Sequence, residues 1–102
     1  MSRLPVFEDT AWSFTRHRGK VQYCTDFTWG GIDYRIVMSF GTKKLYVDLY
    51  SNTVRRMTMT TDMIDTSIVD LQRFAFGIVI YYLSQATPLV DALQEPLPFW
   101  QH

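Results

Sequence analysis

Trp29-Gly30-Gly31-Ile32 sets the strand register of this chain. Two adjacent glycines between segments of alternating hydrophobicity are typical of a two-residue hairpin turn, because both central residues of a type I′ turn need a positive φ. The sequence therefore predicts two antiparallel strands in which Trp29 lies opposite Ile32.

Pairing outward from this turn gives a single register for both strands. The pairs on one face are mostly apolar on both sides: Phe27 with Tyr34, Thr25 with Ile36, Tyr23 with Met38 and Val21 with Phe40. The pairs on the other face are mostly polar: Thr28 with Asp33, Asp26 with Arg35, Cys24 with Val37 and Gln22 with Ser39. A slip of one residue would turn the apolar set toward water, so the pattern and the turn favour the same register.

Three further strands extend the predicted sheet. A third strand continues the apolar face, with Leu45, Val47 and Leu49 opposite Phe40, Met38 and Ile36. A fourth strand near residues 55–61 sets Met57 against Leu49 and Met59 against Val47, after a loop of Asn52, Thr53 and Val54. Upstream, an Arg18-Gly19 turn places Phe14 opposite Tyr23 and Trp12 opposite Thr25. The result is a five-stranded meander over about residues 11–61.

A helix over about residues 66–85 supplies the cover that the apolar face needs. Asp65 or Thr66 caps its start, and helical spacing predicts one apolar stripe: Ile68, Leu71, Ala75, Ile78 and Tyr82. Much of the remaining helix surface is apolar as well, so we expect burial on more than one side. The sheet is one cover, and the C-terminal segment or a second subunit is the other. Thr87-Pro88 predicts a break after the helix.

The fold class is therefore α+β, an antiparallel β-meander of four to five strands with one face covered by a long C-terminal helix. Residues 1–102 form one domain that ends in an extended tail over residues 95–102. We expect nearly complete burial of Ile36, Met38, Val47, Leu49, Leu71 and Ile78. We expect substantial exposure of Arg35, Asp48, Arg56 and Thr58.

Composition excludes several classes of protein. Ten basic residues balance ten acidic ones, which argues against a general polyanion binder. Cys24 is the only cysteine, so no disulfide forms within the chain. The apolar run from Phe74 to Leu83 is too short to cross a bilayer, and Met1–Pro5 lacks the apolar core of a signal peptide. We expect a cytoplasmic protein without a membrane partner.

The sequence offers little for catalysis. The Gly30-Gly31 pair belongs to a hairpin tip and does not precede a helix, so it is not a phosphate-binding loop. Residues of the metal-ligating types do not fall at metal-ligand spacing. Cys24 would need a base to act as a nucleophile, and the two histidines lie near a turn and at the chain end. We expect a protein that is not an enzyme and has no cofactor or metal.

Candidate partner-binding residues fall into three groups. The outer sheet face carries aromatic and cationic residues: Arg35, Tyr46, Tyr50 and Arg56. The turn after the first strand concentrates positive charge in Arg16, Arg18 and Lys20. Phe99 and Trp100 in the tail either fold back onto the domain or dock into a partner. Aromatics among arginines suit both protein interface hot spots and single-stranded nucleic acid.

Three functions follow from these features. The leading one is a small non-enzymatic protein-interaction module, for example a phage-encoded inhibitor or an adaptor, that acts by surface complementarity on a protein partner. A single-stranded nucleic-acid binder that uses the outer sheet face is an alternative. A structural subunit of a homo-oligomer is another, and a homodimer is the expected assembly because it is the simplest symmetric closure.

Overall fold

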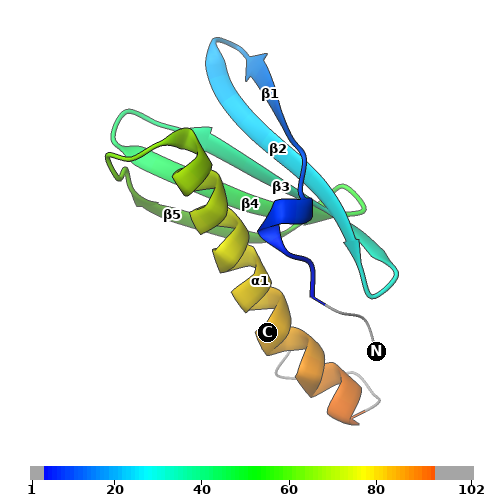
Figure 1. The fold of residues 1–102 in the computed structure, drawn as a ribbon. Coiled ribbons are helices and arrows are strands. Elements are labelled where there is room, and N and C mark those ends of the chain that lie inside the picture. The colour runs from blue at the N-terminus through cyan, green and yellow to red at the C-terminus, as the bar shows by residue number, and fades with distance from the viewer. Residues whose placement is uncertain (1–3, 94–102) are drawn as a thin grey trace.

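The structure, a computed structural model, describes residues 4–93, with side chains described for residues 4–16 and 18–85. These residues form a five-stranded antiparallel sheet in the order β1-β2-β3-β4-β5 with a helix packed on one face, so the fold class is α+β (Figure 1). The strands are β1 (Trp12–His17), β2 (Lys20–Trp29), β3 (Ile32–Phe40), β4 (Lys44–Ser51) and β5 (Val54–Asp62). The 3₁₀ helix η1 (Phe7–Asp9) precedes β1, and α1 (Ile68–Leu93) follows β5.

The predicted register around the Gly-Gly turn is confirmed. Gly30 and Gly31 have φ of 62° and 77°, and Trp29 lies opposite Ile32. The predicted pairing continues along both strands as far as Gln22 and Ser39. The neighbouring hairpins are confirmed as well, with Phe14 opposite Tyr23, Trp12 opposite Thr25, Phe40 opposite Leu45, Met38 opposite Val47 and Ile36 opposite Leu49.

The connection between β4 and β5 differs from the predicted three-residue loop. The turn has two residues, Asn52 and Thr53, with φ of 54° and 62°, and Ser51 pairs directly with Val54. A register shift between Leu49 and Tyr50 then inserts one extra residue on β5. The shorter turn and the β-bulge compensate each other. Met57 therefore still lies opposite Leu49, as predicted.

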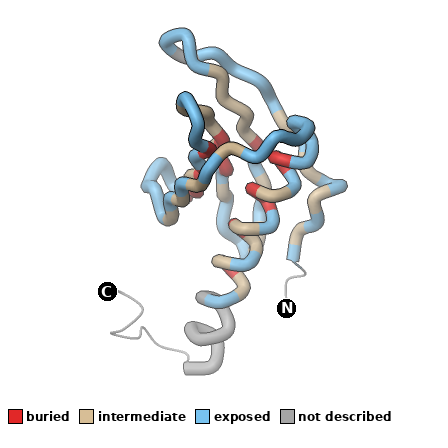
Figure 2. Tube along the Cα trace, turned by 90° about the vertical axis from the view of Figure 1, so that its left-hand side faces the viewer, coloured by how far each residue is buried: buried red, intermediate tan, exposed pale blue. Residues whose placement is uncertain are grey.

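The hydrophobic core lies between β3, β4 and the helix. Its fully or nearly buried members are Ile36, Met38, Leu45, Val47, Leu49, Leu71, Ala75, Phe76, Val79 and Leu83. Figure 2 shows this burial where α1 meets the sheet. Five of the six predicted core residues are buried, and Ile78 is only half-buried. Arg35, Arg56 and Thr58 are exposed as predicted, but the Asp48 side chain is only 16% exposed.

The helix is rotated relative to the predicted stripe. Leu71 and Ala75 are buried as predicted, whereas Ile68 is 38% exposed. Val79 and Leu83 continue the buried stripe where Ile78 and Tyr82 were predicted. A helix that is apolar nearly all round has no sharp stripe in its sequence, so packing decides which residues face the sheet.

The helix also extends beyond its predicted end. It begins at Ile68 and ends at Leu93, so the predicted break at Thr87-Pro88 was wrong. Proline fixes φ near −65°, which is a helical value, so its cost inside a helix comes from the missing N–H and from its ring. The tail from residue 95 onward, including Phe99 and Trp100, lies outside the described residues.

The N-terminal segment around Phe7 packs against α1 on a side that does not face the sheet centre, a contact that the sequence analysis did not predict. The Phe7 ring meets the Phe76 ring of α1 edge to face, with centroids 6.0 Å apart. The Arg73 guanidinium lies 4.5 Å from the Phe7 ring centroid and forms an ion pair with Glu8, with 3.1 Å between Nη1 and Oε2. The N-terminal segment therefore covers the part of the helix around Phe76.

Candidate interaction surfaces

The outer face of the sheet, opposite the helix, holds Arg35 and Lys44 in ion pairs. Arg35 on β3 donates two hydrogen bonds to Asp26 on β2, at 2.7 and 3.0 Å, and these bonds hold the pKa of Asp26 below its usual value. Lys44 Nζ lies 2.6 Å from Asp62 Oδ1. Arg35 and Lys44 each face a carboxylate, so the positive charge of these two residues is largely neutralised.

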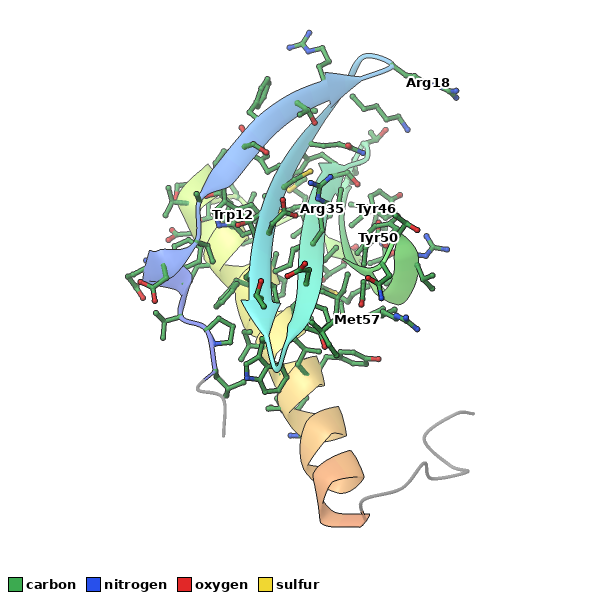
Figure 3. All side chains as sticks on the ribbon, turned by 90° about the vertical axis from the view of Figure 1, so that its right-hand side faces the viewer. Trp12, Arg18, Arg35, Tyr46, Tyr50 and Met57 are labelled. Carbon is green, nitrogen blue, oxygen red and sulfur yellow. The ribbon has the colours of Figure 1, made fainter. Side chains whose placement is uncertain are left out.

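The two tyrosines of the outer face differ in their surroundings (Figure 3). Tyr46 is 38% exposed, and a Cβ built on Gly41 would lie 2.9 Å from Cε2 of its ring. The ring therefore lies directly against the backbone of the β3–β4 turn. Tyr50 is half-buried. Both rings are therefore only partly accessible to a ligand.

The β-bulge removes Arg56 from its predicted place in the outer row. Tyr50 pairs with Arg55 rather than with Arg56, and Arg55 Nη1 lies 3.9 Å from Asp48 Oδ1. The Arg56 carbonyl accepts a hydrogen bond from the Tyr82 hydroxyl of α1 at 3.4 Å. Burial raises the pKa of Tyr34 on the helix side of the sheet, and the positive charge of Arg56 opposes that rise. Arg56 therefore belongs to the helix side of β5.

The predicted basic turn is the tip of the β1–β2 hairpin, which stands away from the start of α1 (Figure 1). Arg18 and Gly19 form the turn with φ of 54° and 79°. Arg16, Arg18 and Lys20 are exposed and form no ion pair within the described residues. We call Arg16 and Arg18 the basic lip; Lys20 alternates with Val21 on β2 and therefore lies on the outer face with Gln22. Arg18 points outward from the tip (Figure 3).

An apolar groove of about 500 Å³, the hairpin groove, lies below this lip on the helix side of the sheet. Val21, Tyr23 and Phe40 line it from β2 and β3. Its other wall comes from the β5–α1 connection and the first turns of α1: Met63, Ile64, Asp65, Thr66, Ile68 and Leu71. The groove exists because the helix begins at Ile68 and packs on β3, leaving this end of the inner face uncovered.

Aromatic rings continue from the hairpin groove across the sheet to its edge. Tyr23 meets Phe40 edge to face with centroids 6.0 Å apart, and Phe14 meets Tyr23 in the same way at 5.4 Å. Phe14 is 55% exposed although its alternation places it on the apolar face. At the opposite end of the face, Phe7 covers the comparable position beside Trp12, with ring centroids 6.5 Å apart.

One acidic residue, Asp65, lies in the wall of the groove on the helix side. A second, Asp70, lies in the first turn of α1. The Asp70 N–H donates a hydrogen bond to the Ser67 hydroxyl at 3.1 Å. Ser67 therefore caps the start of α1, as the first residue of a capping box does. Neither carboxylate takes part in an ion pair within the described range. Asp70 is not among the residues that line the groove, so we call Asp65 alone the acidic lip.

The sequence analysis identified the basic lip but missed the groove beside it. Phe14, Ile64 and Ile68 are exposed apolar residues at this site. In the sequence, these residues belong to the apolar alternation of β1 and to the apolar residues around the start of the helix. Both patterns are typical of buried core residues. Only the position of the helix on the sheet distinguishes a buried residue from an exposed one here.

In residues 4–93 no helix is long and apolar enough to cross a membrane. The same residues contain no cluster of three or more histidine, cysteine or acidic side chains placed to hold a metal ion. Phe99 and Trp100, predicted as partner-binding residues, lie outside the described residues.

Comparison of the chain with known protein families, with curated proteins and with solved structures finds no match to any of them.

Proposed function

We propose that this chain is a small protein-interaction module that acts by surface complementarity, and that the hairpin groove with its two lips is the binding surface. The observation that carries the proposal is the uncovered end of the inner sheet face. There Phe14, 55% exposed, extends an aromatic row into an apolar groove of about 500 Å³.

Physical reasoning favours a protein as the ligand of this surface. Exposed apolar patches bordered by polar residues are typical of interaction sites, and aromatic residues and arginines dominate the energy of protein interfaces. The groove offers aromatic and aliphatic walls, and Arg16 of the basic lip lies opposite Val21, one of the residues that line it. A partner that inserts an apolar side chain and presents a carboxylate to the hairpin would use both features.

The outer sheet face supports binding less well. A single-stranded nucleic acid needs accessible rings and unpaired cations. Arg35 and Lys44 are held in ion pairs, and the Tyr46 ring lies against Gly41. The surface that the sequence analysis favoured therefore offers fewer free groups than the hairpin groove does.

A random-peptide library displayed on phage tests this proposal with a defined probe. The protein is immobilised at low concentration, and we expect enrichment of peptides in which an aromatic or aliphatic residue adjoins Asp or Glu. Binding of the selected peptides should weaken about tenfold or more in Phe14→Ser, because this change removes an interface aromatic without touching the core.

Tyr50→Ala is the matched control, since it removes an aromatic side chain from the outer face. Peptides that bind Tyr50→Ala and the unmodified protein equally well support the groove. Peptides that lose affinity for Tyr50→Ala but not for Phe14→Ser would contradict the proposal and return the site to the outer face. Failure to enrich any peptide family would also contradict it.

A further inference from the structure

We infer that a second copy of this chain docks in the hairpin groove and forms a two-fold symmetric dimer. The inference rests on the proposed function, because it names the partner of the same surface. It follows from how charge and apolar surface are distributed around the groove.

The two sides of the groove carry opposite charge. The hairpin side presents the basic lip, and Arg16 lies opposite Val21, which lines the groove. The helix side presents the acidic lip, Asp65, which lines the groove. Arg16, Arg18 and Asp65 form no ion pairs within the described part of the chain. Both lips therefore have their charge available for a partner.

A surface with this arrangement is complementary to itself. In a two-fold dimer the same patch meets its own copy, so that residue i contacts residue j and residue j contacts residue i. If the axis passes through the groove, the basic lip of one copy faces the acidic lip of the other, and this contact occurs twice. A patch with one sign of charge on both sides would repel its copy in the same position.

Exposed apolar side chains supply the centre of this interface. Phe14 is 55% exposed, Ile64 48% and Ile68 38%. Burial of such side chains stabilises association by about 25 cal/mol per Å² of apolar area, before the cost of association is subtracted. The formal net charge of the chain is zero, so overall repulsion does not oppose a second copy.

Charge reversal at one residue of each lip tests the pairing. The molar mass of the full chain is measured by sedimentation equilibrium up to about millimolar concentration, where a weak dimer is still populated. The unmodified chain should dimerise. Arg18→Glu and Asp65→Lys should each weaken the dimer by about tenfold or more, because each places like charges opposite one another.

The decisive step combines the two reversals. An equimolar mixture of Arg18→Glu and Asp65→Lys should form a heterodimer, and the double variant Arg18→Glu/Asp65→Lys should recover self-association. Both positions are exposed, so the variants should remain folded, as circular dichroism verifies. Arg56→Glu, an exposed reversal on β5 away from the groove, should leave the dimer unchanged.

Each other outcome overturns the inference. A monomer at about millimolar concentration excludes the dimer. If Arg18→Glu and Asp65→Lys both dimerise like the unmodified chain, the dimer uses another surface. If each single variant is monomeric and their mixture forms no heterodimer, the two lips do not face each other. A monomeric protein that still binds selected peptides through Phe14 would refute the dimer and leave the proposed function intact.

Discussion

Phe14 on β1 and Tyr23 on β2 meet edge to face, with ring centroids 5.4 Å apart, at the end of the sheet that the helix leaves open. Tyr23 is half-buried, and Phe14 is 55% exposed. The same face is closed at its other end, where Phe7 packs between Trp12 and Phe76. One end of this sheet face is therefore covered by the helix and the N-terminal segment, and the other end remains accessible. The proposed binding surface is the accessible end.

The β4–β5 and β2–β3 turns each have two residues with positive φ. Substitutions at the second residue of each turn should change the free energy of unfolding in opposite directions. Thr53 has a φ of 62°, which is unfavourable for a β-branched residue, whereas Gly31 has a φ of 77° at the equivalent position. Thr53→Gly should raise the free energy of unfolding by about 1 kcal/mol, and Gly31→Thr should lower it by a similar amount. Urea denaturation measures both changes. Equal effects of the same sign would contradict the turn geometry.

Truncation in the core should be far more costly than truncation on the surface. Ile36 on β3 is fully buried against the helix, so Ile36→Ala should lower the free energy of unfolding by about 2–5 kcal/mol. Thr58→Ala, on an exposed position of β5, should change it by no more than about 0.5 kcal/mol. Chemical denaturation of the two variants provides the measurement. A loss below about 1 kcal/mol for Ile36→Ala would mean that the helix does not pack there.

The N-terminal contact should weaken in acid. A backbone hydrogen bond and the Arg73 guanidinium hold the pKa of Glu8 below its usual value. A depressed pKa in the folded state stabilises the fold above the pKa of the unfolded chain, and this contribution disappears as the pH falls through the folded value. The free energy of unfolding should therefore drop below about pH 4, and Glu8→Gln should make that drop smaller. An unchanged acid dependence in Glu8→Gln would contradict the Glu8–Arg73 contact.

Cys24 should react slowly with alkylating reagents. It is half-buried on β2, and burial raises the pKa of its thiol, which lowers the fraction of reactive thiolate. Labelling by iodoacetamide at about pH 8 should be much slower in the folded protein than in urea, where the thiol is solvated. Similar rates in both conditions would show that the β2 environment does not protect this cysteine.

The sheet could be predicted from the sequence because each of its determinants is local. The two glycines place a turn, and the alternation of apolar residues allows only one register for Phe27, Tyr34 and their neighbours. The β-bulge beside Tyr50 could not be predicted in this way. A two-residue turn with a bulge and a three-residue turn without one give Met57 the same partner, and they differ only in the place of Arg56.

The candidate site was harder to predict because it depends on where the helix lies on the sheet. The sequence of α1 is apolar on several sides, so its pattern does not distinguish the residues that face β3 from those that remain exposed. Phe14 and Ile68 have the composition of core residues but lie outside the helix contact. The ion pair of Arg35 with Asp26 follows directly from the register of β2 and β3.

Backbone amide chemical shifts recorded during titration with a phage-selected peptide test the central claim most directly, because they locate a contact residue by residue. If the hairpin groove is the binding surface, the largest changes should fall on Phe14, Tyr23, Phe40 and Ile68, with small changes at Tyr46 and Tyr50. Large changes at Tyr46 and Tyr50 with none at Phe14 or Ile68 would contradict the account.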